Sequence, residues 1–227
     1  MSKKEQEAPE TTGIEGLNDS LTAMTQKVQD NRKIIMICSL VVVAIVVIVL
    51  AYVYFFRNPG MQKHNDNIGS ADLQLALSND SVALKQYMDI ADNGNFEPAN
   101  RAALESAILL YRDGKYEEAL KYAEKYSTRD EIIGAGALAL KGDCLVNLDK
   151  LADAVSAYKE AISVSDHNPA YTPYFIMKLA RVYREQGNFA EEAKVLEEIQ
   201  NEYPLYGQQH NLDIEKLLDR ARLQAAK

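Results

Sequence analysis

A short set of residues recurs along the C-terminal half of the sequence at a separation that suits stacked helical hairpins. Gly114, Tyr116 and Ala119 lie between two segments whose apolar residues follow a helical period. Leu151 and Ala154 have the same mutual spacing as Tyr116 and Ala119, and Ala154 follows Ala119 by 35 residues. That period is typical of a helix-turn-helix unit, which stacks on its neighbours because one pair cannot bury its apolar side alone. We therefore predict an all-α chain of antiparallel helix pairs.

A third copy of the pattern runs from Phe175 to Pro204, with one residue more in its second helix. Ala180 and Gly187 continue the small-residue pattern, but Ala193 follows Phe189 by four residues, where the other copies use three. Small residues allow the two helices to approach, a Gly lets the chain leave the first helix, and a large side chain fills the turn. The predicted repeat-packing residues are Gly114, Tyr116, Ala119, Gly142, Leu151, Ala154, Ala180, Gly187, Phe189 and Ala193.

This pattern resembles the tetratricopeptide repeat over residues 99–204, in about three copies. The resemblance implies an α-solenoid in which the first helix of each pair lines a concave groove for an extended peptide or a helix. Arg181 and Arg184 suit carboxylates, since a guanidinium can donate two parallel hydrogen bonds to one. The family's carboxylate clamp is not expected, because its lysine position holds Leu104, Ala139 or Met177. Register with the family nominates as groove residues Arg101, Leu104, Ile108, Tyr111, Asp143, Val146, Asn147, Tyr174, Met177, Arg181 and Arg184.

The segments on either side of the repeats also have helical patterns. Residues 57–98 contain a linker and a leading helical pair, and residues 205–227 carry an amphipathic helix. A final helix with a polar outer face is what the open end of a solenoid requires. We expect about nine helices after the apolar segment described next.

An apolar run of 23 residues without a charge occupies residues 34–56. A bilayer core needs about 20 apolar helical residues, so the run predicts a single transmembrane helix. A cleaved signal peptide is not expected, because its apolar core is shorter and ends in small residues, whereas this run ends in YVYFF. Three Lys or Arg residues closely precede the run and two follow it, which favours a cytoplasmic N-terminus and a periplasmic C-terminal domain.

The N-terminal tail, residues 1–33, is polar except for one apolar stripe. Ile14, Leu17, Leu21, Met24 and Val28 are spaced by three and four residues in turn, as on one face of a short helix. One interpretation is an amphipathic helix that lies on the membrane surface. The other is a helix that binds a partner or a second copy, which would make the protein a self-assembling structural component of the membrane.

The order of tail, anchor and repeats is similar to that of membrane-anchored tetratricopeptide proteins of bacterial envelopes, a group that includes the ancillary subunit of the Sec translocon. The segments EEALKYAEKYSTRDEIIGAGALALKGDCLVNLDKLADAVSAYKEAI and EIQNEYPLYGQQHNLDIEKLLDRAR carry this resemblance. It implies a scaffold at the inner membrane that binds proteins such as translocon subunits, envelope chaperones or exported clients. It does not identify which of them.

Residue patterns for other functions are not found. The net charge of −8 argues against nucleic-acid binding. The sequence has no motif that predicts a catalytic site, metal or cofactor, and Cys38 and Cys144 have no zinc or disulfide spacing. We interpret Cys144 as a small buried residue. The pairs 117–118 and 191–192 are Glu–Glu at helix starts, where they favour the helix dipole and are expected to face water.

Overall fold

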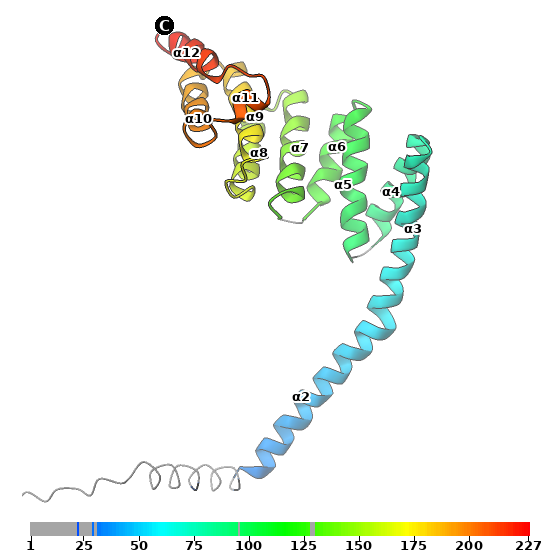
Figure 1. Ribbon diagram of the computed structural model, residues 1–227. Helices are drawn as coiled ribbons and strands as arrows, with labels where there is room; N and C mark the ends of the chain where they lie inside the picture. The colour runs from blue at the N-terminus through cyan, green and yellow to red at the C-terminus, as the bar shows by residue number, and fades with distance from the viewer. Residues whose placement is uncertain (1–21, 23–28, 30, 95, 128–129) are drawn as a thin grey trace, which may run out of the picture. The chain divides into compact units, whose positions relative to one another are not determined.

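The computed structural model describes residues 22, 29, 31–94, 96–127 and 130–227, and all regular structure in these residues is helical (Figure 1). This confirms the all-α prediction. The chain divides into two units, Met1–Pro59 and Gly60–Lys227, which are described separately. The apolar stripe expected between residues 14 and 28 lies outside the described residues.

The first unit contains one long apolar helix. It consists of α2 (Arg32–Tyr52) and the π-helical turn η1 (Val53–Arg57), and its side chains are exposed over almost its whole length. The 26 residues from Arg32 to Arg57 are long and apolar enough to cross a bilayer. A membrane span and a signal sequence share this length and composition.

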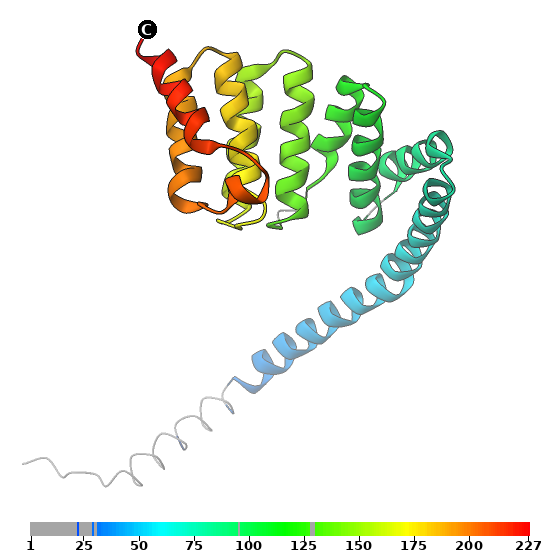
Figure 2. The ribbon, with the colours of Figure 1, turned by 45° about the horizontal axis from the view of Figure 1, so that its top comes forward.

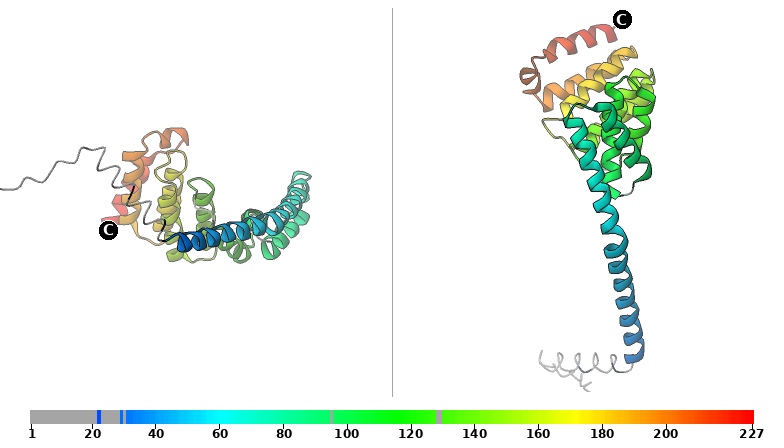
Figure 3. Two further views of the ribbon diagram at one scale, coloured as in Figure 1. Left: turned by 90° about the horizontal axis from the view of Figure 1, so that it is seen from below. Right: turned by 90° about the vertical axis from the view of Figure 1, so that its right-hand side faces the viewer.

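The second unit is a row of stacked helix pairs (Figures 2 and 3). Ten α-helices follow η1 in the described part of the chain, compared with the nine expected, and the additional helix is the four-residue α11. The final helix, α12, packs against α10. The helices are α3 (Asn58–Ala76), α4 (Asp80–Asn93), α5 (Phe96–Arg112), α6 (Tyr116–Lys125), α7 (Ile133–Asn147), α8 (Leu151–Val164), α9 (Thr172–Glu185), α10 (Phe189–Glu202), α11 (Tyr206–Gln209) and α12 (Ile214–Ala225).

Four turns with the same backbone join the helices of the four pairs. Each contains one residue with positive φ, namely Ser78 (61°), Gly114 (75°), Asp149 (57°) or Gly187 (71°). The N–H of the next residue donates to the carbonyl five positions earlier, as from Lys115 to the carbonyl of residue 110 at 2.9 Å. This is the Schellman end of a helix, which satisfies carbonyls left over in the last turn. The leading pair α3/α4 therefore has the same turn as the three predicted copies.

The common turn fixes the register of the four pairs. Seven residues before each positive-φ residue lies a buried small residue, in turn Ala71, Ala107, Gly142 and Ala180. Five residues after it come Ala83, Ala119, Ala154 and Glu192, all buried and all donating their N–H four residues back. In the third copy Glu192, rather than the expected Ala193, takes this place.

Small residues on the first helix accommodate large ones on the second. A Cβ added at Gly142 would lie 2.6 Å from the ring of Tyr158, so the ring occupies the space that a side chain would need. The turn residues Tyr116, Leu151 and Phe189 are half-buried.

Cys144 is fully buried, as predicted, beside the core of the first two pairs. Burial, together with the charge of Asp143, raises the pKa of its thiol to about 12. The thiol is therefore neutral at physiological pH and acts as a small packing residue.

Candidate protein-binding face

We call the eleven groove residues predicted above the inner face, and the structure distributes them over α5, α7 and α9. Arg101, Asn147 and Arg181 are exposed, and Ile108 and Tyr174 expose 37% and 45% of their surfaces. Met177 is buried. The remaining five, Leu104, Tyr111, Asp143, Val146 and Arg184, are half-buried. Exposed aromatic, aliphatic and cationic side chains on adjacent helices are suitable contacts for a protein partner.

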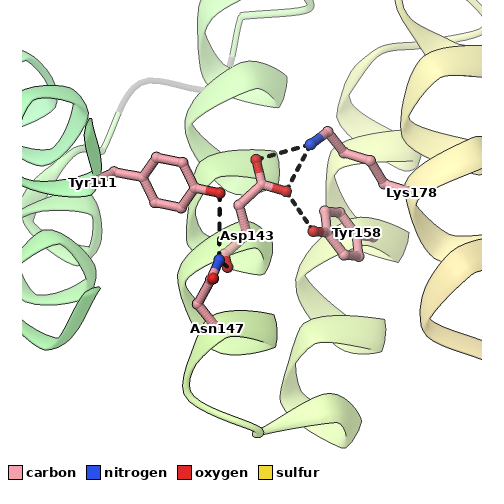
Figure 4. A network of polar contacts seen from close by, with 5 residues as sticks. All are labelled: Tyr111, Asp143, Asn147, Tyr158 and Lys178. Carbon is pink, nitrogen blue, oxygen red and sulfur yellow. Dashed lines mark hydrogen bonds and ion pairs between the residues drawn. The ribbon is translucent and has the colours of Figure 1, made fainter. Parts of the chain in front are cut away.

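Asp143 is the centre of a polar cluster that connects three helices (Figure 4). The Lys178 ammonium donates to both of its carboxylate oxygens at 2.7 and 2.9 Å, and the Tyr158 hydroxyl donates to Oδ1 at 2.6 Å. We call Asp143, Tyr158 and Lys178 the α8 cluster. The Asp143 and Lys178 side chains are only 19% and 18% exposed, so their attraction is weakly screened by water.

The pKa values of the α8 cluster follow from this arrangement. Burial, followed by the charge of Asp143, raises the pKa of the Tyr158 hydroxyl far above its ordinary value. Burial lowers the pKa of the Lys178 ammonium, but the Asp143 carboxylate has the larger, opposite effect, so the pKa is raised overall. Both groups therefore remain protonated at neutral pH and both donate to Asp143.

Asn147 extends this network toward α5 (Figure 4). Its Nδ2 donates to the Tyr111 hydroxyl at 3.3 Å and to the carbonyl of Asp143 at 2.8 Å. Both amide protons are thereby used within the protein. The Tyr111 ring also packs on Tyr116, with ring centroids 5.4 Å apart. Three of the predicted groove residues, Tyr111, Asp143 and Asn147, thus help to join the repeats.

A second cluster with the same chemistry joins the leading pair to α5. The Tyr87 hydroxyl donates to Asp72 at 2.5 Å, and Arg101 donates to both oxygens of Asp72 at 2.9 Å. We call these three residues the α4 cluster. In both clusters the Tyr follows its Asp by 15 residues. Arg101, a predicted groove residue, is therefore already paired with a carboxylate.

Glu192 forms a third ionic contact, and its environment corrects the expectation that the Glu191–Glu192 pair faces water. Its side chain is 2% exposed, with Arg220 of α12 at 3.2 Å and Arg184 of α9 at 4.0 Å. Its Oε2 has no hydrogen-bond partner in the described residues. Burial at the small-residue position of the repeat removes this carboxylate from water, and the two arginines balance its charge. Through its contact with Arg220, Glu192 thus ties the last helix to the repeats.

A pocket of about 250 Å³ lies at the α9 end of the inner face. The short helix α11 and the loop after it form one wall. There the rings of Tyr206 and His210 pack together, with their centroids 4.4 Å apart. We call this the α9 pocket. A larger pocket, of about 340 Å³, lies near the α8–α9 and α10–α11 loops and contains none of the predicted groove residues. The α9 pocket is lined by Tyr174, Met177, Lys178, Arg181, Tyr206, His210 and Leu212.

The charges around the α9 pocket leave one cation available. Lys178 is paired with Asp143, and Arg184 is beside Glu192. Arg181 is exposed and has neither an ion pair nor a hydrogen bond to any residue that the structure describes. Met177 is buried in the hydrophobic core and also lines the pocket.

Several residues that shape the inner face were not nominated from the sequence. Lys178 and Tyr158 belong to the α8 cluster, Glu192 holds the last helix, and Tyr206 and His210 line the α9 pocket. One signal was available: the two Asp–Tyr pairs share a spacing of 15 residues. In the described residues no group of three or more His, Cys, Asp or Glu side chains is placed to hold a metal ion.

Comparison with known proteins supports the repeat assignment. A family model for the tetratricopeptide repeat matches residues 135–168, which include most of α7 and all of α8. A comparison with curated proteins gives no match.

Among solved structures, the chain is similar to two crystal structures of MamA. The first has 17% identity and a TM-score of 0.51, covering 69% of this chain and 94% of MamA; the second has 16% identity and a TM-score of 0.53, covering 72% and 88%. It is also similar to the nearly identical TPR-like repeats assigned to a Podosopora anserina kinesin light chain, with 13% identity, a TM-score of 0.50 and coverage of 72% and 95%. At these identities the likeness shows the fold, which is a TPR-like α-solenoid.

Proposed function

We propose that this chain is a membrane-tethered scaffold that binds other proteins on the inner face of its repeats. The observation that carries the proposal is the combination of a TPR-like solenoid with exposed Ile108 on the first helix α5 and exposed Tyr174 and Arg181 on the first helix α9. Repeat solenoids use such extended surfaces for protein contacts. Tethering raises the effective concentration of a weak partner, so a modest intrinsic affinity is sufficient.

The exposed helix from Arg32 to Arg57 supports the tether. We infer that it is an uncleaved anchor of the inner membrane, with the N-terminus in the cytoplasm and the repeats in the periplasm. A signal sequence would satisfy the same length and composition, and the two are distinguished by the intact mass of protein extracted from membranes. We expect the full 25.4 kDa. A mass that lacks the residues up to and including the helix Arg32–Arg57 would contradict an uncleaved anchor.

Chemical labelling tests the orientation. Ser156 is exposed on α8, whereas Cys144 is fully buried. We expect an impermeant maleimide to label a Ser156→Cys variant in spheroplasts, and not the parent protein, which reports any reaction of Cys38 or Cys144. Labelling that appears only after the cells are lysed would place the repeats in the cytoplasm.

Photocrosslinking tests the binding face. A benzophenone amino acid is placed at Ile108 or Tyr174 on the inner face, and at Ser156 on a second helix as a matched control. In intact cells we expect discrete crosslinked proteins from the first two positions and none from the third. Translocon subunits, envelope chaperones and exported proteins are the partner classes that the envelope resemblance suggests. Equal crosslinking from all three positions, or from none, would contradict a scaffold that acts through this face.

A further inference from the structure

The α9 pocket combines an apolar lining with one unpaired cation. Met177 and Tyr206 are buried in its lining, Leu212 is half-buried, and the ring of Tyr174 is exposed at its edge. Arg181 supplies a guanidinium that no described residue neutralises. A cation beside apolar surface favours a ligand that combines an apolar group with a negative charge.

The local charge differs from that of the protein as a whole. The chain has a net charge of −8, yet the charged side chains that line this pocket are Lys178 and Arg181. Asp143 balances Lys178, so Arg181 remains as the site of charge complementarity. Arginine is suited to this role, because its planar guanidinium pairs with a carboxylate through two hydrogen bonds.

From this arrangement we propose that the α9 pocket binds an internal segment of a partner protein in which a bulky apolar residue adjoins Asp or Glu. The apolar side chain enters between Met177, Tyr206 and Leu212, and the carboxylate pairs with Arg181. This assignment rests on the proposed function and specifies the partner's chemistry at one end of the inner face.

The acid is assigned to a side chain rather than to the end of a chain. A terminal carboxylate has a short reach and needs several converging donors. Of the two cationic side chains in the pocket lining, Lys178 is already paired with Asp143. Arg181 therefore supplies the available charged donor in the lining, and an exposed guanidinium is better matched by a carboxylate on a flexible side chain.

Peptide binding to the full-length protein in detergent micelles tests the proposal. The probe is a fluorescein-labelled peptide with blocked ends and a Phe-Glu core between Gly-Ser flanks, measured by fluorescence anisotropy. Matched probes carry Phe-Gln or Ala-Glu, and a fourth ends in Phe with a free carboxylate. We expect the Phe-Glu peptide to bind about 10-fold more tightly than either Phe-Gln or Ala-Glu, since charge-assisted pairing and apolar burial each contribute.

Variants assign the effect to the pocket. Arg181→Gln should weaken the Phe-Glu peptide by about 10-fold and leave the Phe-Gln peptide unchanged, whereas Lys194→Gln removes the same charge from the exposed surface of α10 and should change neither. Leu212→Ala should weaken Phe-Glu more than Ala-Glu. Circular dichroism of each variant verifies that the helices are retained.

The proposal is overturned if Phe-Glu and Phe-Gln bind equally, if Arg181→Gln has no effect, if the free-ended peptide binds best, or if no peptide binds at about 1 mM. These failures are distinguishable from failure of the scaffold itself. If crosslinking from Ile108 and Tyr174 persists in cells, the inner face still binds proteins and only the chemistry assigned to the α9 pocket is wrong. If that crosslinking is also absent, both proposals fail.

Discussion

The α4 and α8 clusters place an Asp, a Tyr and a cation in the same arrangement but in two different environments; the cation is Arg101 in the first and Lys178 in the second. Each has an Asp on a first helix, a Tyr on the second helix 15 residues later, and a cation from the next pair. In the α4 cluster the cation and Asp are 49% and 38% exposed, whereas in the α8 cluster they are 18% and 19% exposed. Because water screens the first ion pair more strongly than the second, similar arrangements correspond to unequal stabilisation.

The largest expected difference comes from removing the two cations. Lys178→Ala leaves the Asp143 carboxylate in a mostly buried position without its partner, and should cost about 2 to 3 kcal/mol of local stability. Arg101→Ala should cost about 0.5 kcal/mol, because water replaces the lost partner of Asp72. Hydrogen exchange of α8 and α4 amides in the full-length protein reports the two local free energies.

A double variant is the control for this comparison. Lys178→Met with Asp143→Asn removes both charges together and should recover most of the stability lost in Lys178→Ala. Equal costs for Lys178→Ala and Arg101→Ala would show that burial does not distinguish the two clusters.

The second comparison concerns the small residue opposite each tyrosine. Gly142→Ala introduces a Cβ within 2.6 to 2.9 Å of three atoms of the Tyr158 ring and should destabilise α7 and α8 by about 1 to 3 kcal/mol. In the leading pair the equivalent residue is already Ala71. Ala71→Gly should cost less, about 0.5 to 1 kcal/mol, through backbone entropy. Thermal unfolding measures both, and a neutral Gly142→Ala would mean that α7 and α8 can move apart at little cost.

The third comparison uses the tyrosines and pH. Burial is the main cause that raises the pKa of both Tyr87 and Tyr158, with a further contribution from the neighbouring Asp. In the unfolded chain tyrosine ionises near pH 10, so above that pH the folded state retains more protons and stability falls as pH rises.

Replacing each tyrosine by phenylalanine separates its contribution to that fall. Each variant should cost about 1 to 2 kcal/mol at pH 7, because an Asp loses one hydrogen bond, and should reduce the stability lost between pH 10 and 12. The reduction should be similar for the two variants, since both side chains are almost fully buried and both hydroxyls keep their protons in the folded state over this pH range. Urea titrations at both pH values measure it. An unchanged alkaline slope in both variants would contradict the assignment to these hydroxyls.

The repeat architecture was predictable because it depends on local and periodic features. Ala119, Ala154 and Gly142 could be recognised from their spacing along the chain, and the pairing of helices follows from small residues at that constant spacing. The apolar run before the repeats was equally clear. These inferences need only the order of residues along one helix or turn.

The features that were missed depend on contacts between distant elements. Glu192 violates the rule that carboxylates are exposed, and what stabilises it includes Arg220, 28 residues later. Lys178 reaches Asp143 across 35 residues, and α11 is too short to have a helical period. Predicting them requires the relative placement of whole helices, which no local pattern contains.

The smallest expected effects concern the turns of the two pairs that carry the clusters. Ser78 and Asp149 hold φ values of 61° and 57°, where Gly114 and Gly187 occur in the other pairs. A left-handed backbone costs a residue with a Cβ about 1 to 2 kcal/mol, and the greater entropy of unfolded glycine offsets part of any gain. Ser78→Gly and Asp149→Gly should therefore each stabilise by about 0.5 to 1 kcal/mol, with the smaller gain at Asp149, because Asp tolerates this conformation better than Ser. Thermal unfolding measures both gains, and Gly114→Ala, which should destabilise, is the control. These turns do not touch either ion pair, so in a double variant the gain from the turn should offset the cost of Lys178→Ala or Arg101→Ala by its full amount. A non-additive result would mean that turn strain and the clusters are coupled.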